Sequence, residues 1–263
     1  MPMDWKFRVI LSTNIPITSP KRSIMIEFLN DIDTQILLFF NSLHMPYFDH
    51  FMKSFSGQFI WAPMYATILY ILYRRFGWKS ATCYFLAIPL IILCTDQLCA
   101  SVIRPAVERL RPSNLNNPIS SLVHVVNEYR GGRFGFPSCH SANSFALAAF
   151  LIPLFARRRF TIFILSWATI NAYSRLYLGV HYPGDLIVGG IIGACIGFTW
   201  YLIAKSIAKR FATPLDNDQQ RFYTQLQIGK RTTTFHLSDI MITMGLAVVL
   251  VIAIKSGISL AIN

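Results

Sequence analysis

The sequence predicts an all-α integral membrane protein, a bundle of about six transmembrane helices preceded by an N-terminal interfacial helical segment. Two observations favour this class. Of the 263 residues, 54% are hydrophobic and only 14% are charged, which is too apolar for a typical soluble domain. The apolar residues also gather in runs long enough to cross a bilayer, and the basic residues fall mainly between those runs.

The N-terminal region differs from the rest of the chain. Its first residues mix Pro, Lys, Arg and Ser and lack the basic start and apolar core of a signal peptide. From Ile24 to Met52 the chain is amphipathic, with Glu27, Asp31 and Asp33 among Ile, Leu and Phe. Three acids within one span are costly at bilayer depth. We therefore expect one or two interfacial helices here, with a transmembrane helix as the alternative.

Six apolar runs follow and predict the transmembrane helices, at about residues 59–73, 81–102, 140–156, 160–178, 186–207 and 240–254. The last run is short for a span, so we expect it to continue towards Leu260 while the Lys255 side chain reaches out to the membrane surface. A polar loop, residues 104–137, separates the second and third runs, and loops of this length are usually functional. A basic linker, residues 208–235, precedes the last run.

The basic residues predict the topology. They follow the first, third and fifth runs, as Arg74, Arg75 and Lys79, then Arg157, Arg158 and Arg159, then Lys205, Lys209, Arg210, Lys230 and Arg231. The positive-inside rule makes this face cytoplasmic, so the 104–137 loop and the turn between the fourth and fifth runs face outward.

Composition also excludes several classes of protein. A net charge of +12 would indicate a nucleic-acid partner in a soluble protein, but here the basic residues lie where loops face anionic lipid. The five cysteines are odd in number and four lie within apolar runs, which is typical of small core residues and not of a disulfide framework. No Cys/His spacing resembles a zinc site, so we expect no metal.

Three polar clusters lie on the predicted outer face. In the first, Arg104 and Arg111 are seven residues apart, so a continuing helix would place both on one face. Guanidinium groups keep their charge and match the oxygens of a phosphate, although such Arg side chains can also reach lipid headgroups. Nearby, Asp96 within the second run either orients an Arg or makes a structural hydrogen bond.

The second cluster, Pro137-Ser138-Cys139-His140, stands at the start of the third run. The free N–H groups of a helix N-terminus bind anions, and Ser138 can cap that helix or contact a phosphate oxygen. Helix capping does not account for His140. Asn143, one turn later, either supports this site or joins helices by a hydrogen bond.

The third cluster holds Arg175, His181 and Asp185. His181 and Asp185 are four residues apart, so the carboxylate can orient the imidazole and leave its other nitrogen free as a base or a nucleophile. The alternative is a structural His–Asp pair at a helix end. If the helices bundle, the three clusters bring cations and two histidines together, which is the chemistry of a phosphate site.

Taken together, the clusters resemble the motifs of the type 2 phosphatidic acid phosphatase superfamily, which also includes vanadium haloperoxidases and glucose-6-phosphatase. The family pattern is Lys-x6-Arg-Pro, then Pro-Ser-Gly-His, then Ser-Arg-x5-His-x3-Asp. The chain has Arg104-x6-Arg111-Pro112, then Pro137-Ser138-Cys139-His140, then Ser174-Arg175-x5-His181-x3-Asp185. It departs from the pattern twice, since Arg104 replaces the usual Lys and Cys139 replaces the usual Gly.

This resemblance implies a metal-independent, cofactor-free phosphatase. His181 would attack phosphorus with Asp185 holding its ring, and His140 would protonate the leaving oxygen and then activate water. Arg104, Arg111, Ser138 and Arg175 would bind the phosphate oxygens. The resemblance covers about residues 57–207, which we expect to be the catalytic membrane core. Residues 1–56 would be the tail with interfacial helices, and residues 208–263 the linker with the final helix.

We expect a lipid phosphate phosphatase in a bacterial inner membrane, with its site on the periplasmic face and its partners limited to the bilayer and the lipid substrate. Undecaprenyl diphosphate is the favoured substrate, with a lipid A phosphate close behind. The residues His124, Asn127, Arg130 and Arg133 either contact the substrate or fold the loop. The alternatives are a lipid phosphotransferase, a non-catalytic lipid-phosphate-binding protein and, least favoured, a transporter.

Overall fold

The computed structural model describes residues 20–211, 223–228 and 231–262. The longer helices in this part of the chain are α1 (Pro20–Ser42), α2 (Pro46–Phe55), α3 (Ala62–Asp96), α5 (Cys139–Phe155), α6 (Arg158–Tyr177), α7 (Pro183–Ala208) and α8 (Leu237–Ile262). The shorter helical segments are η1 (Phe59–Trp61), the π-helical η2 (Gln97–Ile103), α4 (Arg104–Val107), η3 (Ser120–Leu122) and η4 (Val126–Glu128). Two antiparallel strands, β1 (Tyr223–Ile228) and β2 (Arg231–His236), complete the set.

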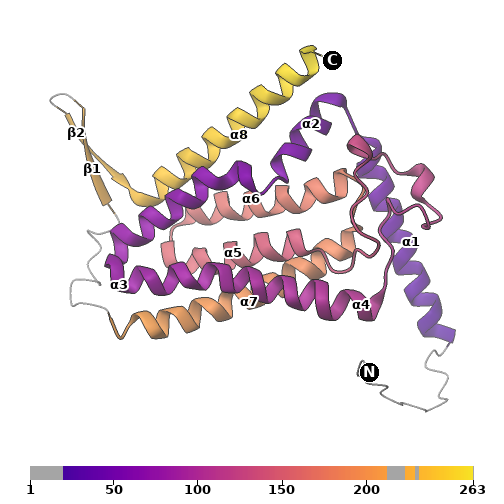
Figure 1. The fold of residues 1–263 in the computed structure, drawn as a ribbon, viewed down its shortest axis with the longest axis horizontal. Coiled ribbons are helices and arrows are strands. Elements are labelled where there is room, and N and C mark those ends of the chain that lie inside the picture. The colour runs from indigo at the N-terminus through magenta and orange to yellow at the C-terminus, as the bar shows by residue number, and fades with distance from the viewer. Residues whose placement is uncertain (1–19, 212–222, 229–230, 263) are drawn as a thin grey trace, which may run out of the picture.

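Helix α3 consists of two arms that reverse direction at Gly77 (Figure 1). This residue has φ 69° and ψ 168°, a conformation that glycine adopts without a steric penalty. The two arms match the first two predicted spans, and the second arm continues through η2 into α4. Together with α5, α6, α7 and α8 they form a helical bundle, which confirms the predicted fold class (Figure 1).

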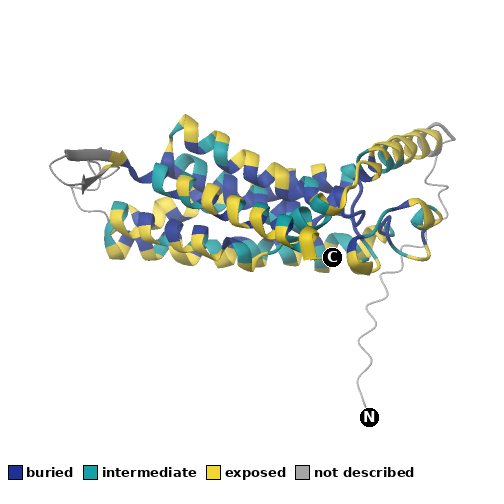
Figure 2. Ribbon diagram, turned by 90° about the horizontal axis from the view of Figure 1, so that it is seen from above, coloured by how far each residue is buried: buried dark blue, intermediate teal, exposed yellow. Residues whose placement is uncertain are grey.

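Within the described residues, three helical segments are long and apolar enough to cross a membrane: Phe59–Val107, which holds both α3 arms, Pro183–Ala208 and Leu237–Ile262. The shorter α5 is also apolar. Large apolar side chains lie exposed along the outer faces of α7 and α8, among them Ile187, Ile191, Leu246 and Leu250. Buried residues lie between the helices and exposed ones on the outside (Figure 2), an arrangement that suits surrounding hydrocarbon.

The tightest helix contact joins α5 to α7. A Cβ added at Gly193 would lie 2.0 Å from the backbone oxygen of Ala142, and one added at Gly197 would lie 2.0 Å from that of Ala146. The third glycine of this row, Gly189, packs in the same way on the backbone of Ser138. Small residues every four positions let membrane helices approach closely. This contact places the start of α7 beside the start of α5.

Helix α1 lies across one end of the bundle, at a steep angle to the bundle helices (Figure 1). Its apolar residues Ile24, Phe28 and Leu29 are exposed together with Glu27 and Asp31. An interfacial position for this helix stays a prediction. The same end carries α2, the 104–137 loop and the α6–α7 connection (Figure 1).

The opposite end carries the Gly77 reversal, the α5–α6 connection and the β1–β2 hairpin (Figure 1). Tyr223 pairs with His236 and Ile228 with Arg231 in the hairpin, so strand structure occurs within the region predicted as a linker. The β-branched run Thr232–Thr234 favours a strand. The last helix starts directly after the hairpin and extends to Ile262, past Leu260 as predicted.

Candidate active site

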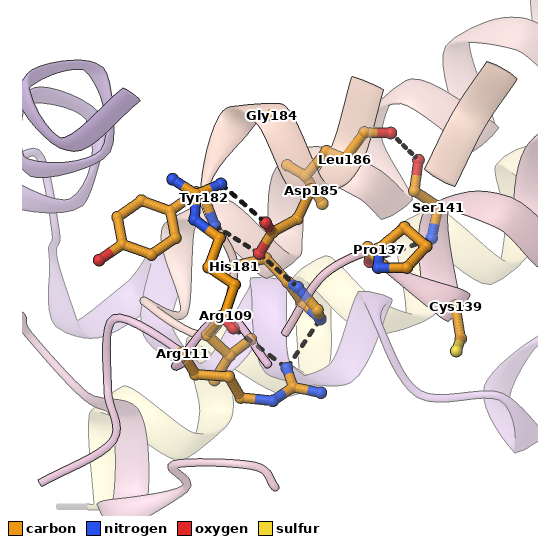
Figure 3. Close-up of polar contacts among 12 residues, drawn as sticks. Arg109, Arg111, Pro137, Cys139, Ser141, His181, Tyr182, Gly184, Asp185 and Leu186 are labelled. Atoms are coloured by element: carbon orange, nitrogen blue, oxygen red, sulfur yellow. Dashed lines mark hydrogen bonds and ion pairs between the residues drawn. The ribbon is translucent and has the colours of Figure 1, made fainter. Parts of the chain in front are cut away.

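His181 and Asp185 form a buried pair at the start of α7 (Figure 3). The Nδ1 atom of His181 lies 3.1 Å from Oδ2 of Asp185, which also accepts a hydrogen bond from the backbone N–H of Tyr182 at 3.1 Å. Asp185 therefore both caps the N-terminus of α7 and orients the His181 imidazole. The side chains of His181 and Asp185 are 2% and 0% exposed, so water does not compete for these bonds.

The second ring nitrogen of His181 faces a cation. Nη1 of Arg111 lies 2.7 Å from His181 Nε2, and it also donates to the backbone oxygen of Val180. A guanidinium can only donate and an ionised carboxylate can only accept. The two contacts together therefore assign the proton to Nδ1 and leave a lone pair on Nε2.

The charge state of His181 agrees with this tautomer. Burial lowers the pKa of His181 well below its ordinary value of 6.5, and the nearby guanidinium groups of Arg111, Arg175 and Arg104 lower it further. Burial likewise lowers the pKa of Arg111 to about 10, so the guanidinium keeps its charge at neutral pH. The site thus pairs a neutral imidazole with a cation.

The path of the chain to Arg111 corrects the expectation that a continuing helix carries both Arg104 and Arg111. Helix α4 ends at Val107, and Glu108 adopts the left-handed conformation with φ 50°. Beyond it, Leu110 forms an isolated β-bridge with Phe134, and the backbone N–H of Arg111 donates to the oxygen of Arg133. Loop pairing, and not helical spacing, brings Arg111 to the site.

Two glycines of the same loop cover these side chains. A Cβ at Gly135 would lie 2.9 Å from Oδ2 of Asp185 and 3.2 Å from Cγ of Arg111. Gly131, with φ 68°, comes similarly close to the Arg111 guanidinium. Neither glycine was predicted as part of the site, although the segment Gly131-Gly132-Arg-Phe-Gly135 is separated from the Pro-Ser-Cys-His motif by one residue only, Phe136.

Arg104 lies beside the N-terminus of α5. Its Nη2 atom donates to the backbone oxygen of Pro137 and to Sγ of Cys139, both at 3.1 Å. The two positions at which the chain departs from the family pattern are therefore in contact. Ser138 is fully buried and caps α5, since its hydroxyl accepts from the N–H of Ser141 at 3.4 Å.

Arg175 extends from the last turn of α6 towards the 104–137 loop. Its Nη2 atom donates to the hydroxyl of Tyr129 at 3.3 Å, and its Nη1 atom to Oγ of Ser56 at 3.5 Å. In the described part of the chain, the buried Nε–H groups of Arg104, Arg111 and Arg175 have no acceptor. A buried cationic donor without an acceptor is costly, and an oxyanion supplies what all three lack.

Two cavities meet at His140. A cavity of about 320 Å³, called the polar cavity here, has Lys53, Ser56, Tyr129, His140 and Arg175 in its wall together with apolar side chains. An apolar cavity of about 380 Å³ extends from His140 and Asn143 between both arms of α3, α5 and α6, and its wall includes Trp61, Tyr65, Phe85, Ile88 and Trp167. His140 thus stands where a polar space joins an apolar one.

A further ion pair reaches the site from α1. Arg109 Nη1 lies 3.0 Å from Oδ1 of Asp185, and its Nη2 lies 2.6 Å from Oδ2 of Asp33 (Figure 3 draws the first contact). The guanidinium of Arg109 also stacks on the ring of Tyr182 at 4.0 Å, and Asp33 accepts from the N–H of Gly184 at 2.7 Å. The sequence analysis noted Asp33 only as a costly acid and did not select Arg109.

The four loop residues selected as possible substrate contacts bond within the protein or remain apart from the two cavities. His124 pairs with Asp49 at 3.0 Å, and Arg130 donates to the backbone oxygen of Ser113 at 2.8 Å. Arg133 stacks on Phe134 at 5.0 Å, and Asn127 adopts the left-handed conformation with φ 50°. A role for them towards substrate stays a prediction, whereas Tyr129 of the same loop does line the polar cavity.

The polar pair inside the bundle has a structural explanation. Nδ2 of Asn143 donates to Oδ1 of Asp96 at 3.0 Å, and the hydroxyl of Thr95 bonds to the Asn143 side-chain oxygen. These bonds join the second arm of α3 to α5. Of the two interpretations left open for each residue, the structure therefore favours the interhelical hydrogen bond.

Comparison with known proteins gives a consistent result. The model of the PAP2 superfamily matches residues 83–208. A lipid A 4′-phosphatase of Bacteroides thetaiotaomicron is 60% identical to this chain over 186 residues, which are 71% of the chain and 83% of that protein. A lipid A 4′-phosphatase of Porphyromonas gingivalis is 33% identical over 183 residues, 68% of the chain and 77% of that protein.

Among solved structures, a transmembrane PAP2-type phosphatidylglycerolphosphate phosphatase from Bacillus subtilis is 21% identical to this chain. The match has a TM-score of 0.49 and covers 73% of the chain and 92% of the solved one.

Proposed function

This chain belongs to the PAP2 superfamily as a membrane-embedded lipid phosphatase, and from that premise we propose that it removes the 4′-phosphate of lipid A. The two relatives described above both bear that activity in their names. Lipid A therefore replaces undecaprenyl diphosphate, which the sequence alone favoured, as the proposed substrate. A phosphatase named for undecaprenyl diphosphate, from Sulfolobus acidocaldarius, is less similar, at 28% identity over 148 residues.

The observation that carries the proposal is the junction of the two cavities at His140. A phosphorylated lipid needs a polar space for its headgroup and an apolar one for its chains, with the catalytic groups at the boundary between them. The apolar cavity extends among bundle helices whose outer faces are apolar. A water-soluble phosphate ester has no apolar chain to place in this cavity.

In the proposed first step, Nε2 of His181 attacks phosphorus in line with the ester oxygen. A phosphorus–nitrogen bond forms, the phosphorus–oxygen bond to the sugar breaks, and protonated His140 gives its proton to the leaving oxygen. Asp185 stabilises the positive charge that develops on the His181 ring through Nδ1–H. Before this attack, Arg111 turns its donors from His181 Nε2 to the phosphate oxygens, which frees the Nε2 lone pair.

In the second step, His140 takes a proton from water, and the resulting nucleophile attacks the phosphohistidine. The phosphorus–nitrogen bond breaks, phosphate leaves, and His181 regains its neutral form. Throughout both steps, Arg104, Arg111 and Arg175 bind the equatorial oxygens with their buried Nε–H donors, which lack acceptors among the described residues.

We place the site on the periplasmic side of a bacterial inner membrane. The bundle end opposite the site carries Arg74, Arg75 and Arg157, and positive residues mark the cytoplasmic side. Helix α1 would then lie in the outer headgroup layer, at the bundle end that holds the candidate site.

The test is phosphate release by the detergent-purified protein from lipid A, undecaprenyl diphosphate and phosphatidate, with wild type compared with His140→Ala and His181→Ala. We expect release from lipid A to be fastest, and fragment-ion mass spectrometry to locate the lost group at the 4′ and not at the 1 position.

Faster release from undecaprenyl diphosphate, or loss of the 1-phosphate, would contradict the proposed substrate while leaving the phosphatase activity intact. A phosphorylated lipid acceptor with little free phosphate would instead indicate a phosphotransferase.

A further inference from the structure

A cluster of metal-ligand side chains lies outside the candidate active site, where the α1–α2 connection meets the 104–137 loop. His44, Asp49 and His124 each place one ligand atom within 4.8 Å of the other two. His44 lies between α1 and α2, Asp49 is on α2, and His124 is 75 residues beyond Asp49 in the chain. Local spacing cannot reveal such a set, which is why the sequence predicted no metal site.

From this geometry we infer a binding site for Zn²⁺ or a similar divalent transition-metal ion. Two imidazole nitrogens and one carboxylate oxygen form a ligand set that suits zinc and leaves a fourth position for water. Calcium and magnesium prefer oxygen ligands alone, so the two imidazoles disfavour them.

The ligands are already oriented by neighbouring groups. Oδ1 of Asp49 accepts from the hydroxyl of Tyr177 at 2.7 Å, which turns Oδ2 towards His124 Nε2 at 3.0 Å. Asn41 holds the His124 backbone from both sides, accepting from its N–H at 2.7 Å and donating to its oxygen at 3.0 Å. Hydrogen bonds that orient ligands in this way accompany metal sites in proteins.

The third ligand, His44, is the adaptable one. Its ring stacks on that of His124 at 3.7 Å with an interplanar angle of 8°, and the residue is exposed. Ligand atoms around a tetrahedral zinc with bonds of about 2.0–2.2 Å lie about 3.3–3.6 Å apart. The ligand atoms of the cluster lie up to 4.8 Å apart, and rotation of the exposed His44 side chain brings its ring nitrogen closer to the other two. The ion then takes the position of the hydrogen between His124 and Asp49, and the His124 proton moves to Nδ1.

An ion here would join two walls of the polar cavity. Helix α2 continues from Asp49 to Lys53, and the loop continues from His124 to Tyr129; both Lys53 and Tyr129 line that cavity. The site would therefore set the spacing between α2 and the loop at the entrance used by the headgroup. It takes no part in the phosphate chemistry.

The experiment is a zinc titration of the full chain in detergent after removal of metal with EDTA, by calorimetry and by elemental analysis of the desalted protein. We expect one Zn²⁺ per chain and a rise in Tm on zinc addition, because an ion that binds only the folded state stabilises it. His44→Ala and His124→Ala should each weaken binding about tenfold or more, since losing a ligand costs at least as much as losing a group that orients one.

The matched control is His50→Ala, because His50 follows Asp49 on α2 but does not belong to the cluster. His44 is exposed, so His44→Ala tests the site even if His124→Ala fails to fold. Absence of saturable binding, or equal loss in His50→Ala and His44→Ala, would overturn the inference. The titration uses no lipid, so its outcome is independent of the proposed phosphatase function.

Discussion

Arg109 offers a sharp test of how the chain holds its catalytic pair. Its guanidinium bridges Asp185 at 3.0 Å and Asp33 at 2.6 Å, and its side chain is 21% exposed. We expect Arg109 to act as a positioning residue, because it holds the carboxylate that holds His181 and both of its anchors are carboxylates of the protein. Loss of Arg109 should therefore lower kcat and leave KM for the lipid nearly unchanged.

The magnitude follows from the bonds removed. A hydrogen bond to a charged group contributes about 1.5–3 kcal/mol. If the loss of the Arg109–Asp185 bond is expressed fully in the transition state, Arg109→Ala should lower kcat about 10- to 150-fold. Asp33→Asn keeps the bond to Asp185 but loses the second anchor, an ion pair that contributes about 0.2–1 kcal/mol, so we expect a loss of about 1.5- to 5-fold.

The assay is steady-state phosphate release with Asp31→Asn as the matched control, because Asp31 is an exposed acid on the same helix. Arg109→Lys should recover only part of the activity, since one ammonium cannot bridge two carboxylates as the planar guanidinium does. If Arg109→Ala and Asp33→Asn both retain the kcat of Asp31→Asn, α1 does not support the catalytic pair and the reasoning is wrong.

Three further predictions concern other parts of the structure. Because Arg104 contacts Cys139 at 3.1 Å, the effects of Arg104→Lys and Cys139→Gly on kcat/KM should be non-additive, and additive effects in the double variant would show that the two departures from the family are independent. Because burial lowers the pKa of His181 below 6.5, the acid limb of the kcat/KM profile that this residue causes should lie below pH 6.5. It should lie at the same pH for phosphomonoesters of different acidity. The stability of the fold should also decrease as the pH falls below 6.5, because the unfolded chain then binds the proton more tightly than the folded one. An acid limb at or above pH 6.5 that is shared by those substrates would contradict the assignment. Gly193→Ala should lower Tm strongly because its Cβ would lie 2.0 Å from the Ala142 oxygen, whereas the Cβ of Gly257→Ala on α8 meets nothing within 4 Å and should leave Tm unchanged or raise it slightly.

The helical bundle was predictable because the length of each apolar run in the sequence directly indicates a membrane-spanning helix. Each predicted span has a corresponding helix or helical arm, and the Gly77 reversal lies between the first two. The interfacial position of α1, argued from the cost of its acids at bilayer depth, stays a prediction. What the sequence did not reveal is how Asp33 is used, because its partners, Arg109 and the N–H of Gly184, lie far away in the chain.

The candidate site likewise contains one contact that the sequence predicted and others that it did not. The His181–Asp185 contact follows from a spacing of four residues, and the sequence predicted it. The contact between Arg111 and His181 was not derivable from the spacing of Arg104 and Arg111, because the chain leaves the helix at Glu108 and returns through the bridge of Leu110 with Phe134. Contacts set by loop pairing, including the His44–Asp49–His124 cluster, leave no periodic signal in a sequence.

The central claim is that His181 carries the phosphoryl group, and trapping that intermediate tests it most directly. Protein mixed with labelled lipid A and quenched within one turnover would be digested and searched by mass spectrometry for a phosphorylated histidine. We predict the label on His181 of the wild type, little of it in His140→Ala because the first step lacks its acid, and none in His181→Ala. Label on another residue, or undiminished phosphate release by His181→Ala, would contradict the account.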